Sequence, residues 1–134
     1  MGDGIGDDGV EAFLAAVEPP ARREDARALA AMMARVTGEP PALSGSIIGF
    51  GRYQYRYASG REGETFRASF APRRTALVLY LGDGCEPERD RLVAALGPLK
   101  TGAGCLYVRR LADVEAGALE RLVAYAHAHP PHAA

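Results

Sequence analysis

Residues 44–62 of the chain read SGSIIGFGRYQYRYASGRE. Within residues 52–57 an arginine or glutamine alternates with a tyrosine. In an extended strand successive side chains point to opposite faces, so the three rings would share one face and Arg52 and Arg56 the other. The preceding residues, 46–51, are apolar and contain two glycines, which is typical of a strand that ends in a bend. This stretch predicts two extended segments that form one bent or paired unit of a β-sheet.

The rest of the chain supplies helices on both sides of the strands. Apolar residues at helical spacing, with capping residues, prolines and glycines at the ends, predict four helices. They are expected at residues 8–17, 21–36 and 87–96 and from Asp113, as the cap, to the prolines at 130 and 131. Further strands are expected at residues 66–70, 76–81 and 105–109. This order predicts an α+β fold whose mainly antiparallel sheet is covered on one face by helices.

Length and composition fit one globular domain. The chain has 134 residues, of which 48% are hydrophobic and 25% charged, so it can bury a core. Neither a disordered nor a fibrous class is indicated. We expect a flexible N-terminal tail at residues 1–9, a single domain at residues 10–128 and a C-terminal tail at residues 129–134.

The sequence also favours a cytoplasmic location. No apolar run approaches the roughly 18 residues that a membrane span needs, and the N-terminus lacks the features of a signal peptide. The two cysteines, Cys85 and Cys105, are too few for a disulfide scaffold, so they are expected as free thiols. The richness in alanine, arginine and glycine is typical of a bacterial genome. Monomer and dimer are both compatible with the sequence.

The charge is unevenly distributed along the chain. The net charge is −1, but residues 1–43 carry −4, residues 44–110 carry +5 and residues 111–134 carry −2. The predicted strands are therefore basic and the predicted helices acidic. The neutral total argues against strong non-specific binding to nucleic acid, while the basic region can still attract an anion.

Three blocks of the sequence resemble a known family. They are GSIIGFGRYQYRYASGREG, APRRTALVLYL and LGPLKTGAGCLYVRRLADV, and they occur in the expected order. They are similar to the motifs of the YdhG-like family, a widespread bacterial domain of unknown function with a fold related to that of frataxin. The resemblance covers residues 10–126. It implies a helix-flanked sheet, and for some members an iron-chaperone function, but it supplies no catalytic residues.

The basic region is the first candidate site. If Arg67 of the next strand lies beside Arg52 and Arg56, three guanidinium groups converge and can hold a carboxylate or phosphate. Residues 100–104 can add a backbone nest for an anion, with Arg109 nearby. The candidate ligand-binding residues are Arg52, Tyr53, Tyr55, Arg56, Arg67, Lys100 and Arg109. The alternative is a solvated sheet face with scattered cations and a packing row of tyrosines; base stacking on the tyrosines is a further alternative.

Acidic residues near the N-terminus form a second candidate site. Several of them fall on one side of the first predicted helix, where carboxylate oxygens can hold iron or another divalent cation. These are Asp7, Asp8, Glu11 and Glu18. Helix capping and compensation of the helix dipole explain the same residues without a metal.

No nucleophile with a neighbouring base is evident in the sequence. The three histidines are terminal, and no serine or cysteine lies in an elbow motif. The sequence therefore favours a non-enzymatic binding domain for a small anion or an acidic protein partner, with no cofactor. A frataxin-like iron carrier is the alternative.

Overall fold

The computed structural model describes residues 9–56, 60, 62–81, 87–102 and 105–129, without the side chains of residues 53–56, 62 and 63. Its elements are α1 (Val10–Ala15), α2 (Pro20–Thr37), β1 (Pro41–Ser44), β2 (Ile47–Arg56), β3 (Glu62–Pro72), β4 (Leu77–Tyr80), α3 (Pro87–Ala95), β5 (Lys100–Gly102), β6 (Cys105–Val108), the 3-10 turn η1 (Leu111–Asp113) and α4 (Ala116–Ala128).

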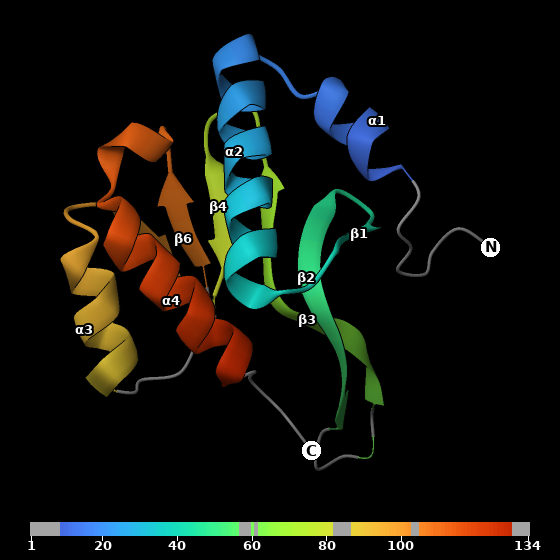
Figure 1. Ribbon diagram of the computed structural model, residues 1–134, viewed down its shortest axis with the longest axis vertical. Coiled ribbons are helices and arrows are strands. Elements are labelled where there is room, and N and C mark those ends of the chain that lie inside the picture. Colours follow the sequence, from blue (N-terminus) through green and yellow to red (C-terminus); the bar gives the residue numbers. More distant parts are fainter. Residues whose placement is uncertain (1–8, 57–59, 61, 82–86, 103–104, 130–134) are drawn as a thin grey trace.

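All six strands belong to one antiparallel sheet with the order β1-β2-β3-β4-β6-β5. The chain runs through four neighbouring strands, crosses through α3 to the far edge and returns through β6 beside β4. Helices α2 and α4 lie across the same face of the sheet, with α3 beside α4 and α1 near the upper end of α2 (Figure 1). The predicted α+β class, with a sheet covered by helices on one face, is confirmed.

The core lies between this face and the two helices. Helix α2 buries Ala26, Leu29, Ala30 and Met33, whose spacing of three and four places them on one stripe. Helix α4 buries a similar stripe that includes Leu122. The strands contribute large side chains that are fully buried: Ile48, Phe50, Phe70, Leu77, Leu79, Leu106 and Val108. Because β4 and β6 are central strands, their residues are apolar at nearly every position.

Strand β2 is a single element with a bend, as the glycines predicted. The register between β2 and β3 is the same on both sides of Gly51, with Phe50 opposite Ala68 and Arg52 opposite Phe66. Gly51 itself has a φ of 83°. At the preceding glycine, Gly49, a Cβ atom would lie 1.9 Å from Cγ of Phe66. The Phe66 ring therefore rests directly on the Gly49 backbone, where only glycine leaves room.

The structure corrects the ends of the predicted first helix. Helix α1 ends at Ala15, two residues before the predicted end, and the cis peptide bond before Pro19 separates it from α2. The second predicted helix is confirmed as α2, with Gly38 in the left-handed conformation after its last residue. An additional strand, β1, begins at Pro41, the second of the two prolines that were expected only to follow the end of this helix.

Two further predictions in the C-terminal third were wrong. Lys100–Gly102, part of the segment of residues 100–104 that was expected to form an irregular backbone nest, is the edge strand β5, because it pairs with β6. Asp113, expected as the cap of the last helix, lies in η1. The N-cap of α4 is Glu115, whose carboxylate accepts a hydrogen bond of 2.6 Å from the backbone N–H of Ala118.

Among the helices that the structure describes, none combines the length and the apolar character needed to cross a membrane.

Candidate functional site

A pocket of about 670 Å³ opens at one end of the sheet, where β4 begins, β6 ends and β5 begins. The antiparallel order of these three strands brings the two starts and the one end to the same edge. The N-terminal turn of α2 and the segment around η1 complete the walls. The lining residues are Arg22, Arg74, Thr75, Ala76, Pro98, Leu99, Lys100, Tyr107, Val108, Arg109, Asp113 and Val114.

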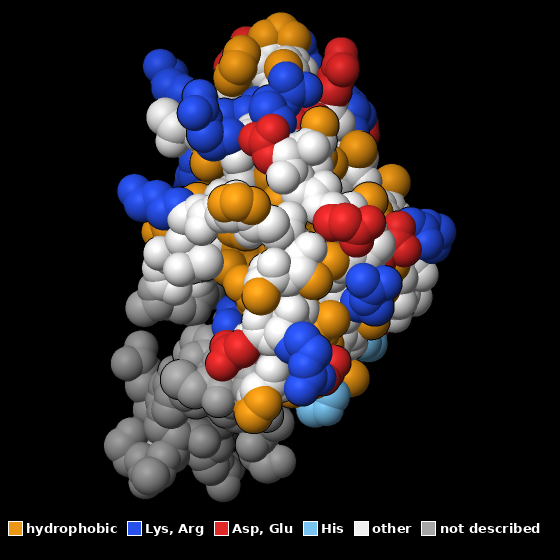
Figure 2. Space-filling model, turned by 90° about the vertical axis from the view of Figure 1, so that its left-hand side faces the viewer, with side chains coloured by type: hydrophobic (Ala, Val, Ile, Leu, Met, Phe, Trp, Pro, Cys, Tyr) orange, Lys and Arg blue, Asp and Glu red, His pale blue; other side chains and the backbone are white. Residues whose placement is uncertain are grey.

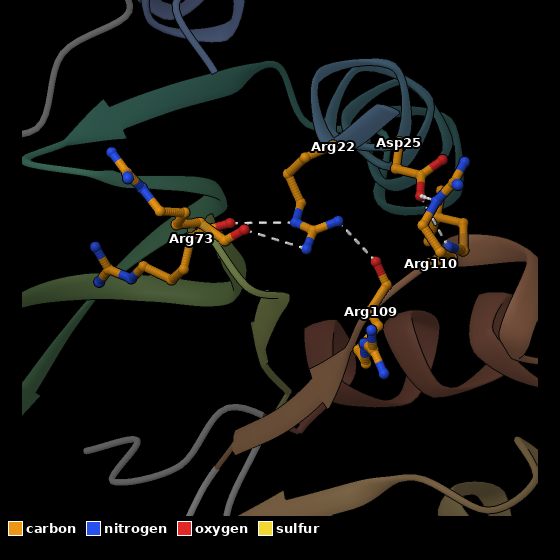
Figure 3. Close-up of polar contacts among 7 residues, drawn as sticks. Arg22, Asp25, Arg73, Arg109 and Arg110 are labelled. Carbon is orange, nitrogen blue, oxygen red and sulfur yellow. Dashed lines mark hydrogen bonds and ion pairs between the residues drawn. The ribbon is translucent and has the colours of Figure 1, made fainter. Parts of the chain in front are cut away.

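Arg22 is the buried cation of this pocket, with 7% of its surface exposed. Its guanidinium donates hydrogen bonds to three backbone carbonyls: Nε to Arg73 (3.1 Å), Nη2 to Arg74 (3.3 Å) and Nη1 to Arg109 (2.9 Å). Figure 3 shows the group lying between the turn that precedes β4 and the end of β6. Arg22 thus fixes α2 against both strand ends, and in the described part of the chain it forms no ion pair.

An ion pair lies beside Arg22 and holds the same end of α2. Asp25 Oδ2 accepts hydrogen bonds from Nε of Arg110 (2.8 Å) and from the backbone N–H of Leu111 (3.1 Å) (Figure 3). Burial disfavours the charged carboxylate, but these hydrogen bonds and the positive charges of Arg110 and Arg22 outweigh it and lower the pKa of Asp25. The hydrogen bond that Arg110 donates to Asp25 likewise raises the pKa of Arg110.

Three exposed cations surround the mouth of the pocket: Arg74, Lys100 and Arg109. Within the part of the chain that the structure describes, none of the three forms an ion pair with a carboxylate. The side chain of Arg109 points away from the guanidinium of Arg22 (Figure 3). On the face that carries α3, β6 and η1, Lys and Arg side chains gather toward one end (Figure 2).

The balance of charge in the pocket is positive. Four cations and one carboxylate, that of Asp113, line it. The Nζ of Lys100 lies 5.7 Å from the ring centroid of Tyr107, its cross-strand partner. The Tyr107 hydroxyl is hydrogen-bonded to Cys105, and this hydrogen bond raises the pKa of Tyr107. The pocket can therefore hold an anion through charge-assisted hydrogen bonds.

Among the predicted ligand residues whose side chains the structure describes, it brings together Lys100 and Arg109, which both line the pocket. Arg67 instead donates a hydrogen bond of 2.9 Å from Nη1 to the backbone oxygen of His127 on α4. Arg52 is exposed and pairs in register with Phe66, the neighbour of Arg67. Because adjacent residues of a strand point to opposite faces, Arg52 and Arg67 do not converge. The side chains of Tyr53, Tyr55 and Arg56 lie outside the described residues.

Glu11 and Glu18, the predicted metal ligands that the structure describes, lie near arginines of α2. Glu11 Oε2 is 2.7 Å from Nη1 of Arg27, and Glu18 Oε2 is 3.6 Å from Nη1 of Arg23. Glu11 lies on α1, whereas Glu18 lies in the segment after this helix, so the two carboxylates do not share one helix face. No group of three or more potential metal ligands occurs among the residues described.

The other two predicted ligands of iron, Asp7 and Asp8, lie outside the described residues. The iron site as a whole therefore stays a prediction.

Sequence reasoning missed Arg22 and Arg74 as members of the site. A signal for Arg22 was present, because it precedes Ala26 by four residues and Leu29 by seven and thus lies on the buried stripe of α2. An arginine at such a position needs buried acceptors. For Arg74 the sequence shows only a basic turn, and its presence in the same pocket as Lys100 depends on the order of the strands.

No protein-family model matches the chain, and neither the curated proteins nor the solved structures include a significant match to it.

Proposed function

We propose that this protein is a non-enzymatic cytoplasmic binding domain that holds a small anionic ligand in the pocket at the end of β4, β5 and β6. The observation that carries the proposal is the excess of cations around this pocket. Arg74, Lys100 and Arg109 lie at its mouth without ion pairs among the described residues, and Arg22 lies buried behind them. Several cations that line one concave surface without a carboxylate partner favour a bound anion.

The dimensions support a small molecule over an acidic protein. A volume of about 670 Å³ falls within the range of roughly 300–1,000 Å³ that is usual for small-ligand pockets. An acidic protein surface would contact the exposed cations but would leave Arg22 and the interior of the pocket unused. A small ligand would therefore contact more of the pocket-lining residues, including Arg22, than an acidic protein would.

The test is ligand-induced thermal stabilisation by phosphate, sulfate, pyrophosphate and citrate at constant ionic strength. A ligand at about 100 times its Kd adds roughly 2.7 kcal/mol to the free energy of unfolding, so we expect an increase of several degrees in Tm. The pocket variant Lys100→Ala with Arg109→Ala should abolish this increase, because it removes two of the exposed cations.

A matched control removes two cations elsewhere. Arg91 and Arg121 are exposed and lie outside the pocket, so Arg91→Ala with Arg121→Ala changes the net charge equally and should keep the anion effect. The proposal is wrong if none of the four anions raises the Tm of the parent protein, or if both double variants reduce the effect equally.

A further inference from the structure

The walls of the pocket are as much apolar as charged. The apolar lining residues are Ala76, Pro98, Leu99, Val108 and Val114, to which the Tyr107 ring adds an aromatic surface. Val108 is almost completely buried, and Leu99 and Val114 are half-buried against the core. The interior wall is therefore an outlying part of the hydrophobic core that remains open to the pocket.

The cations and the apolar wall lie next to each other along the same strand ends. Leu99 precedes Lys100, and Val108 precedes Arg109. In each pair the cation is exposed and the apolar residue is at least half-buried. A ligand whose anionic group contacts the exposed cations would thus have the rest of its body beside apolar side chains.

The size of the pocket exceeds what an inorganic anion fills. Its 670 Å³ corresponds to about twenty water molecules at roughly 30 Å³ each. A phosphate or sulfate ion would leave most of the apolar wall in contact with water, and burial of that wall is a further source of affinity. The carboxylate of Asp113 in the lining would also repel a ligand with many negative charges.

From these features we infer that the ligand is an organic anion with an apolar body, an acyl or aryl phosphate or carboxylate. The inference depends on the proposed function, because it concerns the same pocket. The anionic group contacts Arg74, Lys100 and Arg109. The apolar body lies against Leu99, Val108 and Val114, with the ring of Tyr107 beside it.

Calorimetric titration with three probes tests this inference on the full chain at constant pH and ionic strength. Phenyl phosphate carries both parts of the ligand, inorganic phosphate only the anionic part and benzyl alcohol only the apolar part. Phenyl phosphate should bind about tenfold or more tightly than inorganic phosphate, because burial of one ring contributes at least that factor. Benzyl alcohol should bind more weakly than phenyl phosphate by a similar factor.

Two single variants test whether the apolar wall of the pocket contacts the phenyl ring of the ligand. Val114→Ala should weaken phenyl phosphate about threefold or more and leave inorganic phosphate unchanged, because it removes two methyl groups from the lining. Val36→Ala makes the same deletion at a half-buried position outside the pocket and should change neither affinity.

The outcomes separate the inference from the proposed function. If phenyl phosphate and inorganic phosphate bind equally, the inferred ligand class is wrong and the anion pocket stands. If Val114→Ala leaves the preference for phenyl phosphate over inorganic phosphate intact, the phenyl ring does not contact the apolar wall at Val114. The inference is then also wrong. If neither phosphate binds, or if benzyl alcohol binds as tightly as phenyl phosphate, both the inference and the proposed function fail.

Discussion

Among the glycines that the structure describes, Gly49 leaves the least room for a side chain, because it lies against the ring of Phe66. The ring lies so close to the glycine backbone that an added Cβ would come within 1.9 Å of it. A flexible side chain can move away from such a contact, but the aromatic ring of Phe66 is rigid and buried. The glycine thus leaves room for the aromatic ring directly against the backbone of β2.

Gly49→Ala should lower the free energy of unfolding by about 1–3 kcal/mol, because the new methyl group overpacks the site. Urea denaturation measures the change. In a Phe66→Ala background the same substitution should cost less, since the atoms that it meets are gone. An equal cost in both backgrounds would show that the ring is not the obstacle.

The start of α4 shows how one carboxylate sets a helix boundary. Glu115 is at the N-cap and its side chain satisfies the N–H of Ala118, an N–H that has no partner within the helix. Asp113 lies two residues earlier, in η1, and its carboxylate faces the pocket instead. The two acids therefore have different roles, although the sequence suggested Asp113 as the cap.

Glu115→Ala should destabilise the protein by about 1 kcal/mol through the loss of this cap. Asp113→Ala should change stability by no more than about 0.5 kcal/mol, as expected for an exposed side chain outside a helix end. Thermal unfolding of both variants provides the comparison. A larger loss for Asp113→Ala than for Glu115→Ala would contradict the assignment of the cap.

Over the molecule as a whole, the N-terminal end of α2 is joined to distant parts of the chain by polar contacts. Arg22 reaches the carbonyls of the turn before β4 and of the end of β6, and Asp25 binds Arg110 after β6, 85 residues away. The Asp25 side chain is only 13% exposed. These contacts hold α2 against the strand ends that form the pocket. They therefore also maintain the shape of the pocket.

The lowered pKa of Asp25 makes this attachment dependent on pH. Its stabilising contribution is complete above the ordinary carboxyl value of 3.8 and is lost as the pH falls through the lower value of the folded state. Asp25→Asn should cost about 1 kcal/mol at pH 7, and this difference should shrink as the pH falls below 3.8. Denaturant titrations from pH 7 to pH 2 measure it.

The matched control for this prediction is Asp90→Asn, because Asp90 is exposed on α3. It should leave stability nearly unchanged across the same pH range. A cost of Asp25→Asn that stays constant down to pH 2 would mean that the loss comes from packing and not from the carboxylate charge.

The fold class and most of the helices and strands could be predicted because they depend on local patterns. The buried stripe of α2, the glycine after it and the apolar run of β4 are all visible within short windows of sequence. β5 could not be predicted, since Lys100–Gly102 has no strand pattern of its own and is a strand only because it pairs with β6. Edge strands of three residues depend on their neighbour for hydrogen bonds, and the sequence does not show that neighbour.

The sequence by itself determined an antiparallel sheet under helices, a basic middle region and two members of the candidate site, Lys100 and Arg109. Only the tertiary structure decided where the charges meet. The register places Arg52 and Arg67 on different faces of the sheet. The return of β6 beside β4 brings Arg22 and Arg74 into the same pocket as Lys100 and Arg109. The physical reason is that hydrophobic periodicity acts over a few residues, whereas a pocket is made by backbone segments whose pairing is fixed by long-range packing.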